Sequence, residues 1–330
     1  MFMHDIQFIG EKPHEYIFNF QFFRSCLKSM RLRTLPLSLA GVMLGAFIAA
    51  THQSLSPLTV VLLFLTTALL QVLSNLSNEL GDTLHGTDTD QRLGIHYSLM
   101  DGDMTVPQMK CLITVVAVCC ALSGLGMIWA SFGSFFGLEQ AILVLLGAAA
   151  MAAAMRYTLG HNPYGYRGWG DLFVFVFFGL VSVCGGYYIC SHPESGLINT
   201  LFNNSGASPL LPAVVIGLFS VGVLNVNNIR DMKTDAATRT TVALKLGARR
   251  ARIYQTVLIV GGWLVMIAYT ALSATSWTAW LFVLTLPLYV KHLVGVWHRE
   301  EKALDPMLPL LVISTFLFAL LSGVGMIVGN

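Results

Sequence analysis

The chain has 330 residues, of which 55% are hydrophobic and only 11% are charged, and its formal net charge is +2. Soluble domains usually carry about 25% charged residues, so this composition excludes an ordinary soluble protein and indicates a chain that crosses a membrane many times. No long basic tract with interleaved aromatic residues occurs, and we expect no nucleic-acid partner. The six cysteines show no CxxC spacing, so we expect neither a disulfide framework nor a zinc site.

Nine apolar runs have about the length that crosses the hydrocarbon layer of a bilayer. Together they predict an all-α polytopic membrane protein with nine transmembrane helices in one bundle. Residues 1–30 are expected to form a cytoplasmic N-terminal segment, and residues 31–330 a single transmembrane domain. The predicted spans are 34–51, 57–78, 107–131, 138–157, 170–190, 208–228, 251–273, 277–296 and 306–328.

The basic residues give this arrangement an orientation. With nine spans, all 19 Lys and Arg residues fall on one face of the membrane, and the positive-inside rule makes that face cytoplasmic. The N-terminus is then inside and the C-terminus outside. The connections on the opposite face contain only Glu139 and Glu194 as charged residues. We therefore expect a plasma (inner) membrane protein whose chemistry takes place on the cytoplasmic side.

A first polar cluster follows the second span, in the stretch NELGDTLHGTDTD from Asn78 to Asp90. Asn75, Asn78 and Asp82 are spaced i, i+3 and i+7, which places them on one face of a helix. Gly86 then ends that helix, and Asp88 follows in the loop. Acidic residues beside a membrane are often simply solvated, so this run alone does not establish a site.

A second cluster, NVNNIRDMKTD at 225–235, ends the sixth span on the same side. Asn227, Asp231 and Asp235 share a helical face at i, i+4 and i+8, and Asn228 lies beside them. Converging carboxylates repel one another unless a cation neutralises them. Oxygen ligands without His or Cys suit Mg²⁺, which commonly binds one or two carboxylates together with substrate phosphates. The two clusters therefore predict a Mg²⁺-bound diphosphate.

The loop before the fifth span, YTLGHNPYGYRGWGD at 157–171, is rich in aromatic residues and glycine. An interfacial aromatic belt would explain its tyrosines equally well. Asp171 is different, because it lies at the start of the apolar run LFVFVFFG. Carboxylates that enter the apolar layer of a membrane usually have a function. We interpret Asp171 as a substrate-binding residue or as a base that assists an acceptor.

These stretches resemble the UbiA superfamily of intramembrane aromatic prenyltransferases, whose members carry N-D-x-x-D and D-x-x-x-D motifs and nine transmembrane helices. Here the first motif reads Asn78-Glu79-x-x-Asp82, with Glu where Asp is usual, and the second reads Asp231-x-x-x-Asp235. The similarity runs from about residue 30 to the C-terminus. Within the superfamily, the chain is most similar to the branch that prenylates 1,4-dihydroxy-2-naphthoate. This similarity is found in RLRTLP, in residues 157–179 and in NNIRDMKTDAATRTTVALKLG.

The resemblance implies transfer of a polyprenyl group from polyprenyl diphosphate to 1,4-dihydroxy-2-naphthoate, with loss of CO₂ and formation of demethylmenaquinone. It implies Mg²⁺ as cofactor, and Asp82, Asp231 and Asp171 as catalytic residues. The expected metal ligands are Asn78, Asp82, Asp88, Asp231 and Asp235. The expected diphosphate-binding residues are Arg92, Arg230, Lys233, Lys245, Asn227 and Asn228. The expected residues that bind the substrate are Asn75, Arg156, Tyr157, Tyr164 and Asp171.

Two other functions stay open at this point. One is a related enzyme with another aromatic acceptor, such as 4-hydroxybenzoate or a porphyrin. The other is a non-catalytic transporter of Mg²⁺ or lipid, which would place polar groups near the middle of its spans, and the spans show few.

Overall fold

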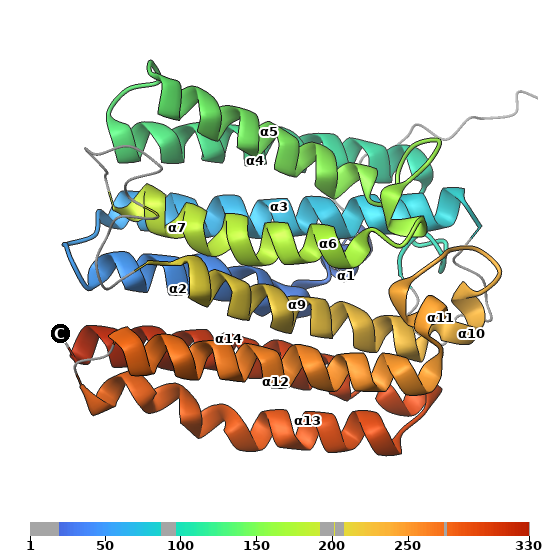
Figure 1. Ribbon diagram of the computed structural model, residues 1–330. Helices are drawn as coiled ribbons and strands as arrows, with labels where there is room; N and C mark the ends of the chain where they lie inside the picture. The colour runs from blue at the N-terminus through green and yellow to red at the C-terminus, as the bar shows by residue number, and fades with distance from the viewer. Residues whose placement is uncertain (1–19, 87–96, 192–200, 202–207, 274–275, 330) are drawn as a thin grey trace, which may run out of the picture.

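The computed structural model describes residues 20–86, 97–191, 201, 208–273 and 276–329. In these ranges the chain forms long helices that lie side by side along one direction (Figure 1). The elements in chain order are α1 (Phe20–Met30), η1 (Leu32–Thr34), α2 (Leu35–Ala50), α3 (Pro57–Leu84), α4 (Val106–Phe132), α5 (Leu138–Arg156), η2 (Tyr164–Tyr166), α6 (Gly170–Val174), η3 (Phe175–Val181), α7 (Ser182–Cys190), α9 (Leu210–Arg230), α10 (Met232–Asp235), α11 (Val242–Leu246), α12 (Ala248–Ser273), η4 (Trp277–Thr285), α13 (Leu286–His298), η5 (Glu301–Leu304) and α14 (Met307–Val328).

Nine segments of the described chain are long and apolar enough to cross a membrane, which confirms the predicted number. The fifth, Gly170–Cys190, has the predicted bounds, and it joins α6, the π-helical η3 and α7. The first begins earlier than predicted, at Phe22, because α1 and η1 lead directly into α2. The side of the membrane on which the N-terminus lies stays a prediction from the distribution of Lys and Arg.

Local sequence signals explain where several of these helices begin and end. Ser56 precedes Pro57 and caps α3 by accepting a hydrogen bond from the backbone N–H of Thr59. Thr105 and Gln108 form a reciprocal capping box at the start of α4. Gly133 ends α4 in the left-handed conformation, at φ 64°, which glycine adopts without a steric cost.

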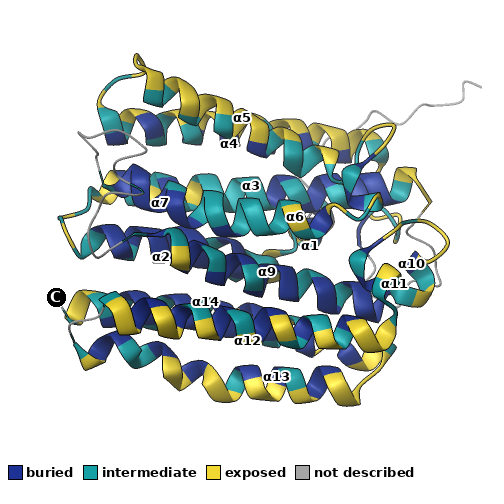
Figure 2. Cartoon of the chain, in the orientation of Figure 1, coloured by how far each residue is buried: buried dark blue, intermediate teal, exposed yellow. Residues whose placement is uncertain are grey.

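The core of the bundle lies along α2, α9 and α14, whereas α5 and α13 are largely exposed (Figure 2). Glycines let the central helices approach closely, as small residues commonly do in membrane bundles. A Cβ atom added at Gly186 of α7 would lie 2.9 Å from the carbonyl oxygen of Val42 on α2. Gly179 of η3 meets Gly217 of α9 in a similar backbone-to-backbone contact. Helix packing rather than charge therefore holds the membrane layer together.

Two connections meet at the end of the bundle where α10 and α11 lie (Figure 1). The α5–α6 connection and the α10–α11 connection are joined by a hydrogen bond from Thr240 N–H to the Tyr166 carbonyl oxygen at 2.9 Å. Arg167 and Thr240 form the β-type bridge found among the described residues. The α13–α14 connection reaches the same end, where Asp305 accepts a hydrogen bond from Arg230 of α9. These contacts bring distant parts of the sequence into one polar region.

We expect Gly186→Val to destabilise the protein by about 1–3 kcal/mol, because the new side chain would collide with the α2 backbone. Gly185→Val is the matched control, since a Cβ there meets nothing within 4 Å and the change in helix propensity is the same. The measurement is thermal unfolding of both variants in detergent. Equal melting temperatures for the two variants would contradict the close α2–α7 contact.

Candidate active site

Asp82 lies buried near the C-terminal end of α3 and is held from the loop before the fifth span. The hydroxyl of Tyr166 donates a 2.7 Å hydrogen bond to Asp82 Oδ1. The edge of the His85 ring packs against the Tyr166 ring at 5.3 Å. One turn earlier, Asn78 Oδ1 accepts from the hydroxyl of Thr158 at 3.3 Å. Asn78 and Asp82 of the first motif therefore both face the α5–α6 connection.

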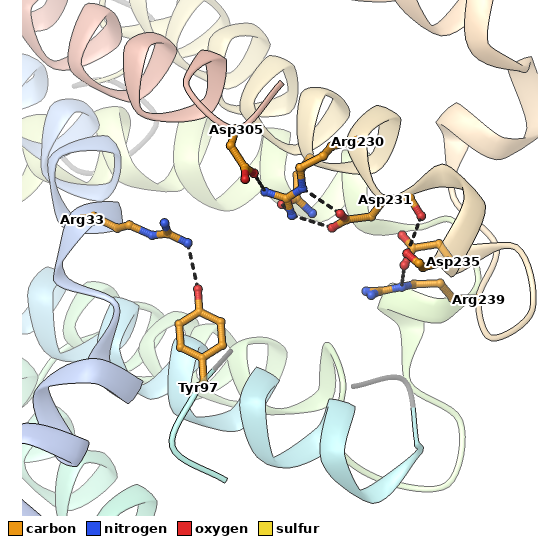
Figure 3. A network of polar contacts seen from close by, with 9 residues as sticks. Arg33, Tyr97, Arg230, Asp231, Asp235, Arg239 and Asp305 are labelled. Carbon is orange, nitrogen blue, oxygen red and sulfur yellow. Dashed lines mark hydrogen bonds and ion pairs between the residues drawn. The ribbon is translucent and has the colours of Figure 1, made fainter. Parts of the chain in front are cut away.

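The second motif begins where α9 ends, and a buried arginine holds its first carboxylate. Arg230 donates from Nε to Asp231 Oδ1 at 2.7 Å and from Nη2 to Asp231 Oδ2 at 2.6 Å. The same guanidinium donates to Asp305 at 2.9 Å and to Asn227 Oδ1 at 2.8 Å, as Figure 3 shows for the acidic partners. Asp231 is only 1% exposed. The bidentate ion pair with Arg230 therefore neutralises a carboxylate whose burial alone would strongly destabilise the fold.

Arg239 links the second motif to the first. Its Nε donates to Asp235 Oδ1 at 2.8 Å (Figure 3), and its guanidinium carbon lies 5.7 Å from the centre of the Tyr166 ring. Burial alone would lower the pKa of Arg239, but the nearby carboxylates of Asp82 and Asp235 raise it above its ordinary value. One guanidinium group therefore bonds to an acid of one half of the chain and lies within electrostatic reach of an acid of the other half.

Asp171 and three tyrosines extend this cluster toward the membrane layer. Tyr254 of α12 donates a 3.0 Å hydrogen bond to Asp171 Oδ2. Tyr157 lies within electrostatic reach of Arg239, Asp82, Asp171 and Asp235. Burial raises the pKa of Tyr157 to about 12, so its hydroxyl keeps its proton at neutral pH. The ring of Tyr164 stacks on Phe173 at 3.9 Å, and its hydroxyl donates to the Ala153 carbonyl.

Two residues of the first cluster face a different part of the molecule. The side-chain amide of Asn75 donates to the Met30 carbonyl and to the Thr34 hydroxyl, each at 2.9 Å. Glu79 is fully buried, and its Oε1 accepts from the backbone N–H of Leu99 at 2.9 Å. Asn75 lies two turns before Asp82, where the junction between α1 and η1 covers α3. Asn75 and Asp82 lie on the same face of α3, but they therefore contact different parts of the protein.

The remaining predicted residues are distributed around the same end of the bundle. The side chain of Lys245 on α11 lies close to Gly168 in the α5–α6 connection. A Cβ atom added at Gly168 would be 3.4 Å from Lys245 Nζ. Lys233 is exposed and forms an ion pair with Glu301 of η5. Arg156 is exposed at the end of α5, and Asn228 is buried in α9. Asp88, Asp90 and Arg92 lie outside the described residues.

Sequence reasoning missed four residues that organise this region, namely Tyr166, Arg239, Tyr254 and Asp305. Tyr166 and Arg239 do belong to stretches that composition singled out as aromatic or basic. Nothing in their spacing distinguished them from neighbouring tyrosines and arginines. Asp305 and Tyr254 carried no local signal, because their partners lie far away in the sequence.

The donor atoms in this region fit Mg²⁺ held jointly with phosphate oxygens. Asn78, Asp82, Asp231 and Asp235 offer only hard oxygen ligands, the kind that Mg²⁺ prefers. Within the described part of the chain, no three His, Cys, Asp or Glu side chains converge on one point. That arrangement suits a cation completed by a substrate, and it does not suit a cage built from protein alone.

The sequence model described as the UbiA prenyltransferase family matches residues 38–316. The chain belongs to the UbiA prenyltransferase family. Its similarity to curated proteins also covers most of its length. The chain is 36% identical over 309 residues to a protein of Haemophilus influenzae, covering 92% of this chain and 95% of that one. It is 37% identical to a protein of Escherichia coli K12, with 86% and 88% covered. Both relatives bear the name 1,4-dihydroxy-2-naphthoate octaprenyltransferase.

Solved structures of UbiA homologues share the fold. The apo structure of a homologue from Aeropyrum pernix K1 superposes with a TM-score of 0.68 at 17% identity, covering 90% of this chain and 98% of that one. A homologue from Archaeoglobus fulgidus bound to DMAPP and Mg²⁺ gives 0.63 at 16% identity, with 93% and 100% covered. The helical arrangement is therefore that of the UbiA family.

We expect Tyr166→Phe to lower kcat/KM for prenyl transfer by about ten- to a hundredfold, because a hydrogen bond to a buried charged group is lost. Tyr188→Phe is the matched control, since it removes another tyrosine–carboxylate bond, to Glu139 at the opposite end of the bundle. Steady-state kinetics of the two purified variants decide the point. Similar activity in both would show that the Tyr166–Asp82 contact has no part in the reaction.

Proposed function

We propose that this protein transfers a polyprenyl group from polyprenyl diphosphate to 1,4-dihydroxy-2-naphthoate, with loss of CO₂, in menaquinone synthesis. The observation that carries the proposal is that Arg239 bonds to Asp235 and lies within electrostatic reach of Asp82, at one end of a bundle of apolar helices. The names of the curated relatives support the same acceptor. The direct product is the quinol form of demethylmenaquinone, because prenyl transfer with loss of CO₂ leaves both ring hydroxyls in place.

The head of the donor binds at the two acidic motifs in this proposal. Asn78, Asp82, Asp88, Asp231 and Asp235 hold Mg²⁺, which supplies the positive charge that stabilises a departing diphosphate. The fit of these oxygen donors and the Mg²⁺ in the Archaeoglobus homologue support this assignment. The cationic and amide side chains of Arg92, Arg230, Lys233, Lys245, Asn227 and Asn228 orient the diphosphate and balance its charge.

Charge balance at the diphosphate permits the allylic C–O bond of the donor to break, leaving a carbocation-like prenyl group. An electron-rich ring carbon of the acceptor attacks it, and the carboxyl group of the acceptor leaves as CO₂. Arg156, Tyr157, Tyr164 and Asp171 are the proposed substrate-binding residues near the two motifs, whereas the amide of Asn75 is bonded to Met30 and Thr34. Asp171 accepts a proton from an acceptor hydroxyl as the ring carbon attacks and returns it to that oxygen as CO₂ leaves, and Tyr254 holds the carboxylate in place. Burial of the site excludes water, which would otherwise capture the cation.

The donor tail needs an apolar path, and a row of stacked rings begins at this site. Tyr164 stacks on Phe173, and Phe173 stacks on Phe177 at 6.1 Å along the fifth span. These rings lead from the polar end into the membrane layer. We propose that the tail follows them toward the bilayer of the inner (plasma) membrane, and that the site opens to the cytoplasm, as the distribution of Lys and Arg indicates.

The test of the reaction uses purified protein, radiolabelled polyprenyl diphosphate, Mg²⁺ and carboxyl-labelled 1,4-dihydroxy-2-naphthoate. Lipid-soluble product and released CO₂ should appear together and in equal amounts. Parallel reactions with 4-hydroxybenzoate and with a porphyrin test the other acceptors. Turnover only with one of these would refute the naphthoate acceptor. Absence of turnover with all three would refute the enzymatic function.

We expect Asp82→Asn and Asp231→Ala each to lower prenyl transfer by at least about a hundredfold, because each removes a charge that acts on the leaving group. Glu301→Gln is the control, since it removes an exposed acid that pairs with Lys233. The assay requires equal amounts of each variant in the membrane fraction, because Asp231→Ala also leaves Arg230 without its main partner. Full activity in both acid variants would refute the assigned site.

A further inference from the structure

We propose that Arg239 is an internal counter-ion that competes with the divalent cation for the two acidic motifs and leaves Asp235 when the metal-bound diphosphate enters. The inference rests on the proposed function, because it concerns the same site. It gives Arg239 a role in the metal affinity of the protein as well as in its reaction.

The position of Arg239 carries this inference. Its Nε is bonded to Asp235 Oδ1 at 2.8 Å, and its guanidinium lies beside the Tyr166 ring, whose hydroxyl holds Asp82. Its side chain is 12% exposed and that of Asp235 is 5% exposed. Asp82 also acts electrostatically on the guanidinium. Arg239 therefore lies where a cation shared by the two motifs would lie.

Charge repulsion explains why a cation is needed in this position at all times. Asp82 and Asp235 are both buried, and like charges that converge in a poorly solvated region destabilise each other. A guanidinium group or a divalent cation can each relieve this repulsion. Both are attracted to the same carboxylates, so a metal ion that binds there must displace Arg239 or bind more weakly because of its charge.

Arg230 provides the contrast that makes Arg239 the movable partner. Arg230 is 8% exposed and donates four hydrogen bonds to Asp231, Asn227 and Asp305. In the described part of the chain, Arg239 donates one hydrogen bond, to a residue one helical turn away. The residues just before it, 236–238, are exposed to solvent. Displacement of Arg239 therefore breaks few contacts, whereas displacement of Arg230 would break many.

The test measures metal binding without turnover. Mn²⁺ is titrated into purified wild-type protein and into Arg239→Gln in detergent, with a constant concentration of inorganic pyrophosphate in place of donor and acceptor, and protein-bound Mn²⁺ is measured by equilibrium dialysis. The expected result is that Arg239→Gln binds Mn²⁺ several-fold more tightly than the wild type, because the competing cation is gone. A purely structural role for Arg239 predicts the opposite sign, since a disordered loop would weaken the site. Equal or weaker binding by Arg239→Gln, or no binding by any variant, overturns the inference.

If Arg239→Gln does not fold, the same Mn²⁺ binding measurement is made with Arg239→Lys. Lysine retains the charge but cannot reproduce the rigid fork of arginine, so its Mn²⁺ affinity should lie between those of the wild type and Arg239→Gln. Affinity of Arg239→Lys equal to or below that of the wild type would overturn the inference. Prenyl transfer by the same wild-type preparation tests the function separately. Metal binding without turnover would count against the function, whereas turnover with the opposite order of affinities would count against this inference alone.

Discussion

Burial of negative charge at one end of an apolar bundle is the constraint on which the rest of this structure depends. Asp82, Asp231 and Asp235 are each at most 3% exposed, yet all three are acids. An unpaired buried carboxylate is very costly, so each needs a partner held in a fixed place. Arg230, Arg239 and Tyr166 are those partners. Arg230 lies at the end of α9, and the connections that carry Arg239 and Tyr166 bring the other two partners to the ends of the helices.

The helices and their ends are stabilised in different ways. In the membrane layer, glycines allow backbone contacts between α2 and α7 and between η3 and α9, so these helices pack closely. At the polar end, hydrogen bonds and ion pairs join α3, α9 and three connections. The proposed donor substrate also has an apolar part and a charged part, namely a polyprenyl tail and a diphosphate head. A protein of this construction can bind the tail by packing and the head by charge.

The two arginines that pair with the carboxylates of the second motif have unequal surroundings. This difference affects how the site stays folded without substrate. Arg230 ties α9 to the α13–α14 connection through Asp305, so it belongs to the scaffold. Arg239 lies on the connection between α10 and α11 and touches the α5–α6 connection through the Tyr166 ring. A site that must accept a metal-bound anion needs both a rigid frame and a cation that can yield. The UbiA fold of this chain supplies the two from neighbouring positions.

The amino-acid sequence by itself determined the nine spans, because the thickness of a bilayer sets a minimum apolar length that does not depend on neighbouring helices. It also determined that Asn78 and Asp82 lie in phase at the end of α3, because that follows from 3.6 residues per turn. The second motif is not on one continuous helix, since α9 ends at Arg230 and Asp235 belongs to α10. Only the tertiary structure decided which side chains pair. Helical phase could not tell that Asn75 faces Thr34 or that Lys233 pairs with Glu301. Nor could it single out Tyr166 and Arg239 among similar neighbours, because their contacts arise where two long connections meet in space and not from spacing along the chain.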